Sequence, residues 1–472
     1  MFCQLETLRH CFPPNLRRFL NELPESLDET YERILKGINK AQKEDARRLL
    51  QCLTVAARPL CVEELAELLA FDFQATSNGG IPALREDWRW NNQEQAVLST
   101  CSSMIAIVPD GDSRVVQFSH FSVKEYLTSR RLASSGGDVS RFHVDLNAAH
   151  TILAQACLGT LLRLDEHTGN SGPKGFPLVE YAARHWVEHA QFGDVSSRVQ
   201  DGIDDLFDAS KPYFSAWLCV HDIDERWGYF SNGYKNSVGS PLYYASFCGF
   251  HDLADRLIMK HPEQVNALGG LNVTPLPAAL SKRHFRVADL LWKHGAVVDV
   301  RDGHDWTPLH TAGYNGSVDI MRWLLKHGSN ASDQADRWGR TPLHQAAYTM
   351  ELGAVQVLLE YKQDINLKDT AGYTPLNDVL AQVDPSREAK VVEIVRRLLE
   401  HGADPNMRLQ GGSTALHKAS SWGSPEVARL LLSYGAKIDE KDEAGETPFQ
   451  VASSGGHDEI VKLLLEQGAV PP

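Results

Sequence analysis

The chain has 472 residues and a formal net charge of −14 at pH 7, and 43% of its residues are hydrophobic. This length exceeds what one compact core usually holds, so two or more domains are expected. Acidic residues outnumber basic ones in both halves, which argues against a nucleic-acid partner. The sequence contains no run of about 18 apolar residues, so neither a membrane span nor a membrane partner is predicted.

The eight cysteines are scattered and form no C-x-x-C pair, so neither a disulfide framework nor a zinc site is predicted. The first ten residues lack the basic and apolar segments of a secretory signal. A reducing, cytoplasmic location is therefore expected.

The first half predicts a mainly helical region with one hairpin. Helices are expected at residues 15–35, 47–57, 62–70, 93–102 and 122–131. Residues 103–108 and 114–118 alternate as strands on either side of the turn Pro109-Asp110-Gly111-Asp112. Three helices, a two-stranded wing and another helix indicate a winged-helix domain at residues 41–135. Residues 136–235 are expected to form a helical linker region.

The second half, residues 236–472, carries a motif that recurs seven times. Its copies start at Ser240, Thr274, Thr307, Thr341, Thr374, Thr414 and Thr447, with spacings of 34, 33, 34, 33, 40 and 33 residues. Five copies begin with Thr-Pro, and three copies have His as their fourth residue. This pattern resembles the ankyrin family. The fold class expected for the chain is mainly α: a winged-helix domain with a β-hairpin wing, a helical linker and an ankyrin-repeat α-solenoid.

Each repeat unit also makes physical sense on its own. Thr caps a first helix that opens with Pro, and a second apolar helix ends at a glycine such as Gly328. In the fourth unit Lys362 replaces this glycine, at an expected cost of about 1 kcal/mol if the backbone is kept. The fifth unit has seven extra residues around Asp384-Pro385, which are predicted to form a loop between its two helices.

The ankyrin resemblance implies a partner surface on the concave face, formed by turn tips and first helices. The family's variable positions select Trp306, Tyr314, Asn315, Arg337, Trp338, Arg340, Tyr348, Thr349, Tyr373, Ser421 and Trp422. Six of these are Trp or Tyr, types enriched at interface hot spots. We predict a groove for a protein partner, centred on repeats three to six. The alternative, open for each ring, is packing between repeats.

The motif histidines His310, His344 and His417 recur at one structural position. This repetition predicts structural residues, and no metal site is expected.

Motifs in the first half resemble a second family. The run from Leu23 to Leu35 (LPESLDETYERIL) is similar to the segment that closes the ATPase region of fungal NACHT–ankyrin proteins, a group of NOD-like signalling ATPases. This likeness assigns residues 1–40 to the tail of that region. Pro59-Leu60 into Val62-Glu63-Glu64-Leu65 resembles the start of the same family's winged helix, a module also found in sequences named after GPI inositol-deacylase. The runs 118–127 and 181–186 are further marks of the family.

One residue, His120, is a candidate nucleotide sensor. The resemblance aligns it with the winged-helix histidine that contacts the β-phosphate of ADP in animal NACHT proteins, and the role requires an ATPase domain. The alternative is a satisfied core histidine at the strand–helix junction.

No catalytic residues and no cofactor are predicted. The sequence has no G-x-x-x-x-G-K-[S/T] phosphate loop, no G-x-S-x-G elbow and no H-E-x-x-H run. The leading interpretation is a non-catalytic interaction module, the ligand-sensing and scaffold part of a NACHT–ankyrin signalling protein, with an ATPase domain upstream or in trans.

Two other interpretations stay open. The chain could be a shortened version of a complete switch ATPase, or a winged-helix DNA-binding regulator. The second is disfavoured because its helices at 62–70 and 93–102 carry Glu63, Glu64, Glu67 and Glu94 but no basic residue.

Overall fold

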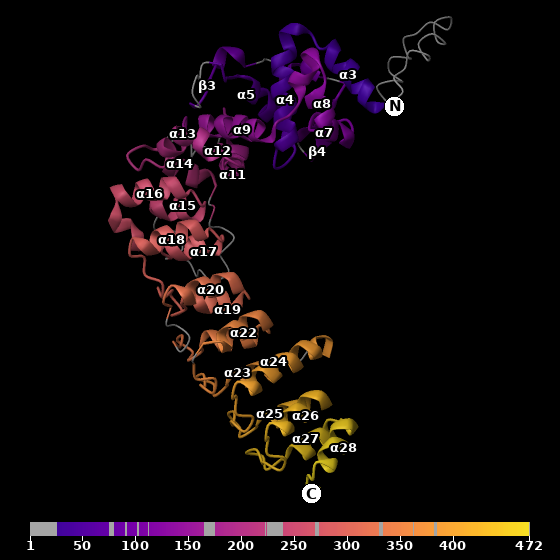
Figure 1. Cartoon of the computed structure of the whole chain (residues 1–472), viewed down its shortest axis with the longest axis vertical. Helices are drawn as coiled ribbons and strands as arrows, with labels where there is room; N and C mark the ends of the chain where they lie inside the picture. Colours follow the sequence, from indigo (N-terminus) through magenta and orange to yellow (C-terminus); the bar gives the residue numbers. More distant parts are fainter. Residues whose placement is uncertain are drawn as a thin grey trace, which may run out of the picture. The chain divides into compact units, whose positions relative to one another are not determined.

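The structure, a computed structural model, describes residues 26–74, 80–89, 92–101, 103–111, 113–164, 175–221, 223, 239–269, 273–329, 334–361, 363–381 and 385–471. It divides into two compact units, Met1–Pro241 and Leu242–Pro472 (Figure 1). Lys362 and residues 382–384 of the insertion lie outside the described residues, as do residues 15–25 of the helix expected at 15–35. The finer division into four domains stays a prediction.

The described part of the first unit is mainly helical, with a small sheet. Its helices and strands are α3 Leu27–Gly37, α4 Lys43–Val55, β1 Leu60–Cys61, α5 Val62–Leu69, β2 Phe71–Asp72, β3 Ala83–Leu84, α6 Gln93–Cys101, β4 Ile105–Asp110, β5 Ser113–Phe118, α7 Phe121–Leu127, α8 Arg130–Ser134, α9 Leu146–Leu161, α11 Val179–Ala190, α12 Val195–Arg198, α13 Gln200–Leu206 and α14 Tyr213–Val220. Short 3-10 turns lie at residues 40–42, 86–88 and 137–142.

The wing of the winged helix has three strands instead of the two that the sequence predicts. β4 and β5 pair antiparallel from Ile105 and Phe118 to Asp110 and Ser113, across a turn where Gly111 has φ 59°. β1 adds to the free edge of β5 through Leu60 and Val116. Two residues give too short an alternation to reveal a strand, so β1 could not be read from the sequence.

The helix expected at residues 122–131 is wrong as one element. α7 ends at Leu127 and α8 begins at Arg130, because Ser129 has extended backbone and its side chain accepts a hydrogen bond from the Leu132 N–H at 3.2 Å. This is a helix N-cap, so a new helix begins after Ser129.

A buried carboxylate ties the winged helix to the helices that follow it. Glu67 of α5 is 3% exposed. Its Oε2 accepts the Leu178 N–H at 2.7 Å, at the start of α11, and its Oε1 accepts Arg89 Nη2 at 2.5 Å. Arg89 also donates to the Gly175 carbonyl at 3.0 Å. The segment before α11 is therefore held on α5 by charge-assisted hydrogen bonds.

Among the described residues of the second unit, each of the seven motif copies contributes one pair of helices, and most of these helices are labelled in Figure 1. The pairs are α15 Pro241–Phe247 with α16 His251–Lys260, α17 Pro275–Ser281 with α18 Phe285–Lys293, α19 Pro308–Tyr314 with α20 Val318–Lys326, α21 Pro342–Tyr348 with α22 Leu352–Leu359, α23 Pro375–Ala381 with α24 Glu388–Glu400, α25 Ala415–Trp422 with α26 Pro425–Ser433, and α27 Pro448–Ser454 with α28 Asp458–Glu466. The mainly helical fold class with a terminal solenoid of repeats is confirmed.

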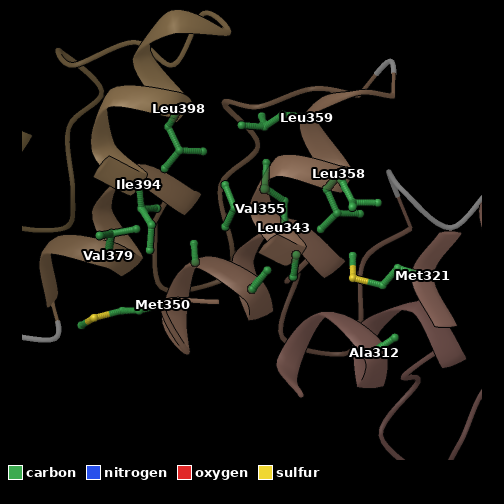
Figure 2. Packing of buried hydrophobic residues seen from close by; sticks show 14 of the residues in the cluster. Ala312, Met321, Leu343, Met350, Val355, Leu358, Leu359, Val379, Ile394 and Leu398 are labelled. Atoms are coloured by element: carbon green, nitrogen blue, oxygen red, sulfur yellow. The ribbon is translucent and has the colours of Figure 1, made fainter. Parts of the chain in front are cut away.

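The repeats share one continuous apolar core. Figure 2 shows Leu343, Leu358, Val379 and Leu398, from successive first and second helices, in this core, and each is at most 1% exposed. Small residues let neighbouring first helices approach. A Cβ added to Gly313 of α19 would lie 2.9 Å from a carbonyl oxygen of the next repeat. No single repeat could bury these faces alone, so the stack is stabilised by contact between neighbours.

The fifth pair differs from its neighbours in the length of its second helix. α24 has 13 residues, whereas α20 and α26 have nine each, and a 3-10 turn at Pro385–Arg387 precedes it. Part of the insertion therefore lengthens the helix, and the predicted simple loop is wrong to that extent. Glu388, in the added turn, accepts a hydrogen bond from Ser424 Oγ of the next repeat.

Candidate protein-binding surface

The motif histidines link successive repeats. The Thr341 N–H donates to His344 Nδ1 at 3.1 Å, so the ring proton lies on Nε2, which donates to the Tyr373 carbonyl of the next repeat at 3.2 Å. His310 and His417 make the same pair of bonds, the second to the carbonyls of Arg340 and Glu446. Burial lowers the pKa of all three histidines, that of His344 to about 4. They are neutral structural residues.

The fifth repeat lacks this link because its motif reads Thr-Pro-Leu-Asn. Asn377 is 1% exposed, and its Oδ1 has no hydrogen-bond partner. A buried acceptor without a partner is unfavourable, and the bond to the sixth repeat is not made by this side chain.

Restoring the histidine is expected to stabilise the stack. Asn377→His should raise the free energy of opening at the interface of repeats five and six by about 1 kcal/mol, the usual worth of one hydrogen bond. Hydrogen exchange of α23 and α25 amides measures this. The matched change His344→Asn should lower the same quantity at the interface of repeats four and five. Unchanged or faster exchange in Asn377→His would contradict the account.

Aspartates at three turn tips hold the residues that precede the first helices of repeats three, four and five. Asp336 Oδ1 accepts the N–H groups of Trp338 at 2.8 Å and Arg340 at 2.9 Å. Asp369 does the same for Ala371 and Tyr373, and Asp302 for His304 and Trp306. The backbone of these turns is thus already formed before any partner binds.

At the turn and first helix of the fourth repeat, two aromatic rings are exposed and each lies under an arginine. Trp338 is 42% exposed, and the Arg337 guanidinium lies 4.4 Å from its ring centre. Tyr348 is 37% exposed, with Arg340 5.3 Å from its ring centre. Arg340 Nε also forms an ion pair with Asp369 Oδ2 at 3.2 Å. We name Arg337, Trp338, Arg340 and Tyr348 the repeat-four cluster.

Three of the other predicted residues pack close to the cluster within the stack. Trp306 is half-buried and its Nε1 donates to Asp336 Oδ2 at 2.9 Å, while its ring lies 5.6 Å from that of Tyr314. Tyr373 is half-buried, and its carbonyl accepts the His344 bond. Trp306 therefore fits the alternative in which the ring packs between repeats, because its indole bonds to the turn of the next repeat.

The remaining predicted residues lie at helix ends. Asn315 is exposed after α19, and Thr349 follows α21 with its Oγ1 donating to the Gln345 carbonyl at 2.9 Å. Ser421 and Trp422 end α25, two repeats beyond the cluster. Trp422 is half-buried against the apolar core. The part of the predicted surface that combines aromatic character with exposure is therefore the repeat-four cluster.

In the winged helix, His120 lies at the predicted strand–helix junction. It is exposed, so the alternative of a core histidine is wrong. Its Nδ1 caps α7 by accepting the Ser122 N–H at 3.3 Å, and the adjacent Phe121 is 72% exposed. Of the acidic residues that disfavoured DNA binding, Glu64 and Glu67 are buried in internal contacts. Their charges therefore do not bear on an outer surface.

The described residues contain no group of three or more His, Cys, Asp or Glu side chains that could hold a metal ion. Within the same residues, no helix combines the length and apolar character needed to cross a bilayer.

Two family models match the chain. The model described as "Ankyrin repeats (3 copies)" matches residues 299–369 and 386–471. The model described as "GPI inositol-deacylase, winged helix domain" matches residues 31–137. The chain therefore contains ankyrin repeats and a winged-helix domain of this type.

Curated relatives include two fungal proteins. Azaphilone pigments biosynthesis cluster protein L of Monascus ruber is 32% identical over 298 residues, 59% of this chain and 61% of that protein. Ankyrin repeat protein nuc-2 of Neurospora crassa is 26% identical over 427 residues, 85% of this chain and 36% of that protein. The matched region thus spans less than two thirds of each relative's length.

Among solved structures, the ankyrin repeat domain of Bcl-3, described as a unique member of the IkappaB protein family, is also similar. It is 29% identical, with a TM-score of 0.43, and the match covers 48% of this chain and 99% of that one.

Proposed function

We propose that this chain, which joins a winged-helix domain to ankyrin repeats, binds another protein through the repeat-four cluster and the turns beside it. The observation that carries the proposal is the pair of rings, Trp338 and Tyr348, each about two-fifths exposed and each covered by an arginine on one repeat. Trp, Tyr and Arg are the residue types that dominate interface energetics.

The cluster is well prepared for binding because its geometry is fixed in the free protein. Asp336 holds the turn that carries Trp338 and Arg340, and Asp369 holds the Arg340 guanidinium. A partner would therefore lose little free energy in ordering these side chains. Arg337 adds an exposed cation, which also contacts His304, so a partner segment with apolar and acidic side chains suits this surface best.

We further propose that the chain serves as the ligand-sensing and scaffold part of a NACHT–ankyrin signalling protein, in the cytoplasm and without catalytic activity of its own. The NACHT-type motifs in the first half and the matching winged-helix domain support this context. Under this proposal an ATPase domain lies upstream or acts in trans, and the exposed His120 next to Phe121 is available to contact it.

The binding proposal can be tested with peptides selected from a randomised display library on the full chain. The double variant Trp338→Ala with Tyr348→Ala is expected to weaken binding of the selected peptides by about 1000-fold, since loss of each hot-spot ring costs about 2 kcal/mol. Calorimetric titration measures the affinity. The folded state should be maintained, because substitutions at exposed positions change stability by about 0.5 kcal/mol or less.

A matched control is available on the second helices. Trp292 and Tyr434 are each 42% exposed and belong to the ends of α18 and α26. Replacing both with alanine should leave peptide affinity within about twofold of the unaltered chain. If no peptide is selected, or if the control pair weakens binding as much as the cluster pair, the proposed surface is wrong.

A further inference from the structure

A carboxyl group is buried beside the repeat-four cluster without a partner for one of its oxygens. Asp378, on the first helix of the fifth repeat, is 2% exposed, and its Oδ2 has no hydrogen-bond partner. An ionised carboxylate in such a place would be strongly unfavourable, because burial removes the water that stabilises its charge. The chain nevertheless keeps an acid here.

The preceding repeat has an amide side chain at the corresponding position. Gln345 lies nine residues after the turn aspartate Asp336, and its Nε2 donates to Asp336 Oδ2 at 3.2 Å. Asp378 lies nine residues after the turn aspartate Asp369. The fifth repeat thus has a carboxyl group where the fourth has an amide donor. A carboxyl group can donate a hydrogen bond only when it carries a proton.

The groups around Asp378 connect it to the cluster. Asp369 Oδ1 accepts hydrogen bonds from the backbone of its own turn, and its Oδ2 accepts one from Arg340 Nε. The Arg340 guanidinium lies over the Tyr348 ring. Arg340 and Asp369 are the described charged groups that act on Asp378.

Neighbouring helices supply other titratable groups. His344 of α21 is neutral, since burial lowers its pKa to about 4, and it bonds to the Tyr373 carbonyl. On α25, His417 has its pKa lowered by burial and bonds to the Glu446 carbonyl, while Lys418 is half-buried. The charge balance at Asp378 therefore depends on two carboxyl groups and one guanidinium.

We propose that Asp378 is a proton-binding site that sets the arrangement of Arg340 and of the turn 369–373. With its proton, Asp378 serves the Asp369 carboxylate as Gln345 serves Asp336. Without it, Asp378 repels Asp369 and competes for Arg340, so that the turn loosens and Arg340 leaves Tyr348. The effect on a partner rests on the proposed function, whereas the proton uptake and the loosening do not.

The site works in the neutral range. Burial raises the pKa of Asp378 to about 7, with Arg340 acting in the opposite direction and Asp369 in the same one. In the unfolded chain the pKa of an aspartate is about 3.9. As pH rises from about 3.9 to about 7, the unfolded chain releases this proton while the folded chain keeps it, so the folded state loses stability over this range. Asp378 ionises in the folded state near pH 7, and the turn is tightest below that pH.

Hydrogen exchange of the full chain, read by mass spectrometry at about pH 5.5 and about pH 8.5, tests the proposal. After correction for the intrinsic pH dependence of exchange, the turn at residues 369–373 should exchange about tenfold faster at the higher pH. In Asp378→Asn, which keeps the shape and supplies a permanent donor, the turn should stay protected at both pH values. The turn at residues 336–340 is the internal control and should not respond.

The variant Gln345→Glu tests whether a buried carboxyl group can make a second turn pH-sensitive. It puts a carboxyl group at the same position in the fourth repeat, so the turn at residues 336–340 should become pH-sensitive. Equal protection of residues 369–373 at both pH values in the unaltered chain would overturn the proposal. So would an unchanged pH response in Asp378→Asn. Because no partner is present in this experiment, its result is independent of the peptide-binding test.

Discussion

Replacing His344 with alanine is expected to lower the free energy of unfolding of the second unit by about 3 kcal/mol. The side chain is fully buried, accepts the Thr341 N–H and donates to the Tyr373 carbonyl of the next repeat. Alanine leaves both backbone groups without these bonds and opens a space in the helix contact. Because repeats are stabilised by their neighbours, the loss should spread to both sides of the substitution.

The same histidine gives this stability a pH dependence. In the folded state burial lowers its pKa to about 4, while in an unfolded chain the pKa of histidine is about 6.5. The unfolded state therefore binds the proton first, and stability is lost as pH falls from about 6.5 to about 4. The contribution is fully present at neutral pH. The variant His344→Ala should therefore lose less stability than the unaltered chain as pH falls over this range.

Hydrogen exchange measures both effects, because it reports the opening free energy of α21 and α23 directly. His294→Ala is the matched control, since His294 is exposed at the end of a second helix. It should change the opening free energy by about 0.5 kcal/mol or less. A His344→Ala chain as well protected as the control would show that the inter-repeat bond does not stabilise the stack.

Replacing Glu67 with alanine is the second large change, with an expected loss of about 3 kcal/mol in the first unit. Glu67 is buried and accepts hydrogen bonds from the Leu178 N–H and from Arg89. Its removal leaves a guanidinium without its carboxylate and the start of α11 without its acceptor. Exchange of α11 amides should accelerate, while the repeats stay protected.

Two further variants separate the causes. Glu67→Gln keeps an acceptor for Leu178 and should lose less stability than Glu67→Ala. Glu63→Ala, four residues earlier on α5 and only partly buried, should change little. If Glu63→Ala and Glu67→Ala destabilise α11 equally, the buried carboxylate does not hold the two regions together.

The repeats could be predicted from the sequence because their determinants are local. Thr341, Pro342 and His344 lie within one helical turn, so capping and helix start are written in consecutive residues. The same holds for Gly328, whose φ of 92° ends α20. The period of the motif then fixed the number of units, since each unit buries its apolar face on the next.

The features that could not be predicted depend on residues far apart in the chain. The burial of Glu67 cannot be seen in the sequence, because its partner Leu178 is 111 residues away. The exposed His120 was also unreadable, since exposure depends on how α7 sits in the domain. Trp306 and Trp338 carry similar sequence signals at their turns. Only the fold shows that one indole bonds to Asp336 while the other ring faces outward.

Asp378 illustrates a signal that was present in the sequence but needed the structure to be understood. Its spacing from Asp369 equals that of Gln345 from Asp336. The meaning of this spacing appears only with the bond between Gln345 and Asp336 and with the burial of Asp378. The fifth repeat pairs two carboxyl groups, Asp369 and Asp378, where the fourth repeat pairs a carboxylate with an amide.

A hydrogen-exchange footprint of a selected peptide on the full chain tests directly whether the partner binds at the repeat-four cluster. The account predicts slower exchange at the turns and first helices of repeats three to five, namely residues 301–314, 336–349 and 369–381. It also predicts no change in the winged helix. Protection confined to the second helices, or to the first unit, would contradict the claim that this chain binds its partner through the repeat-four cluster.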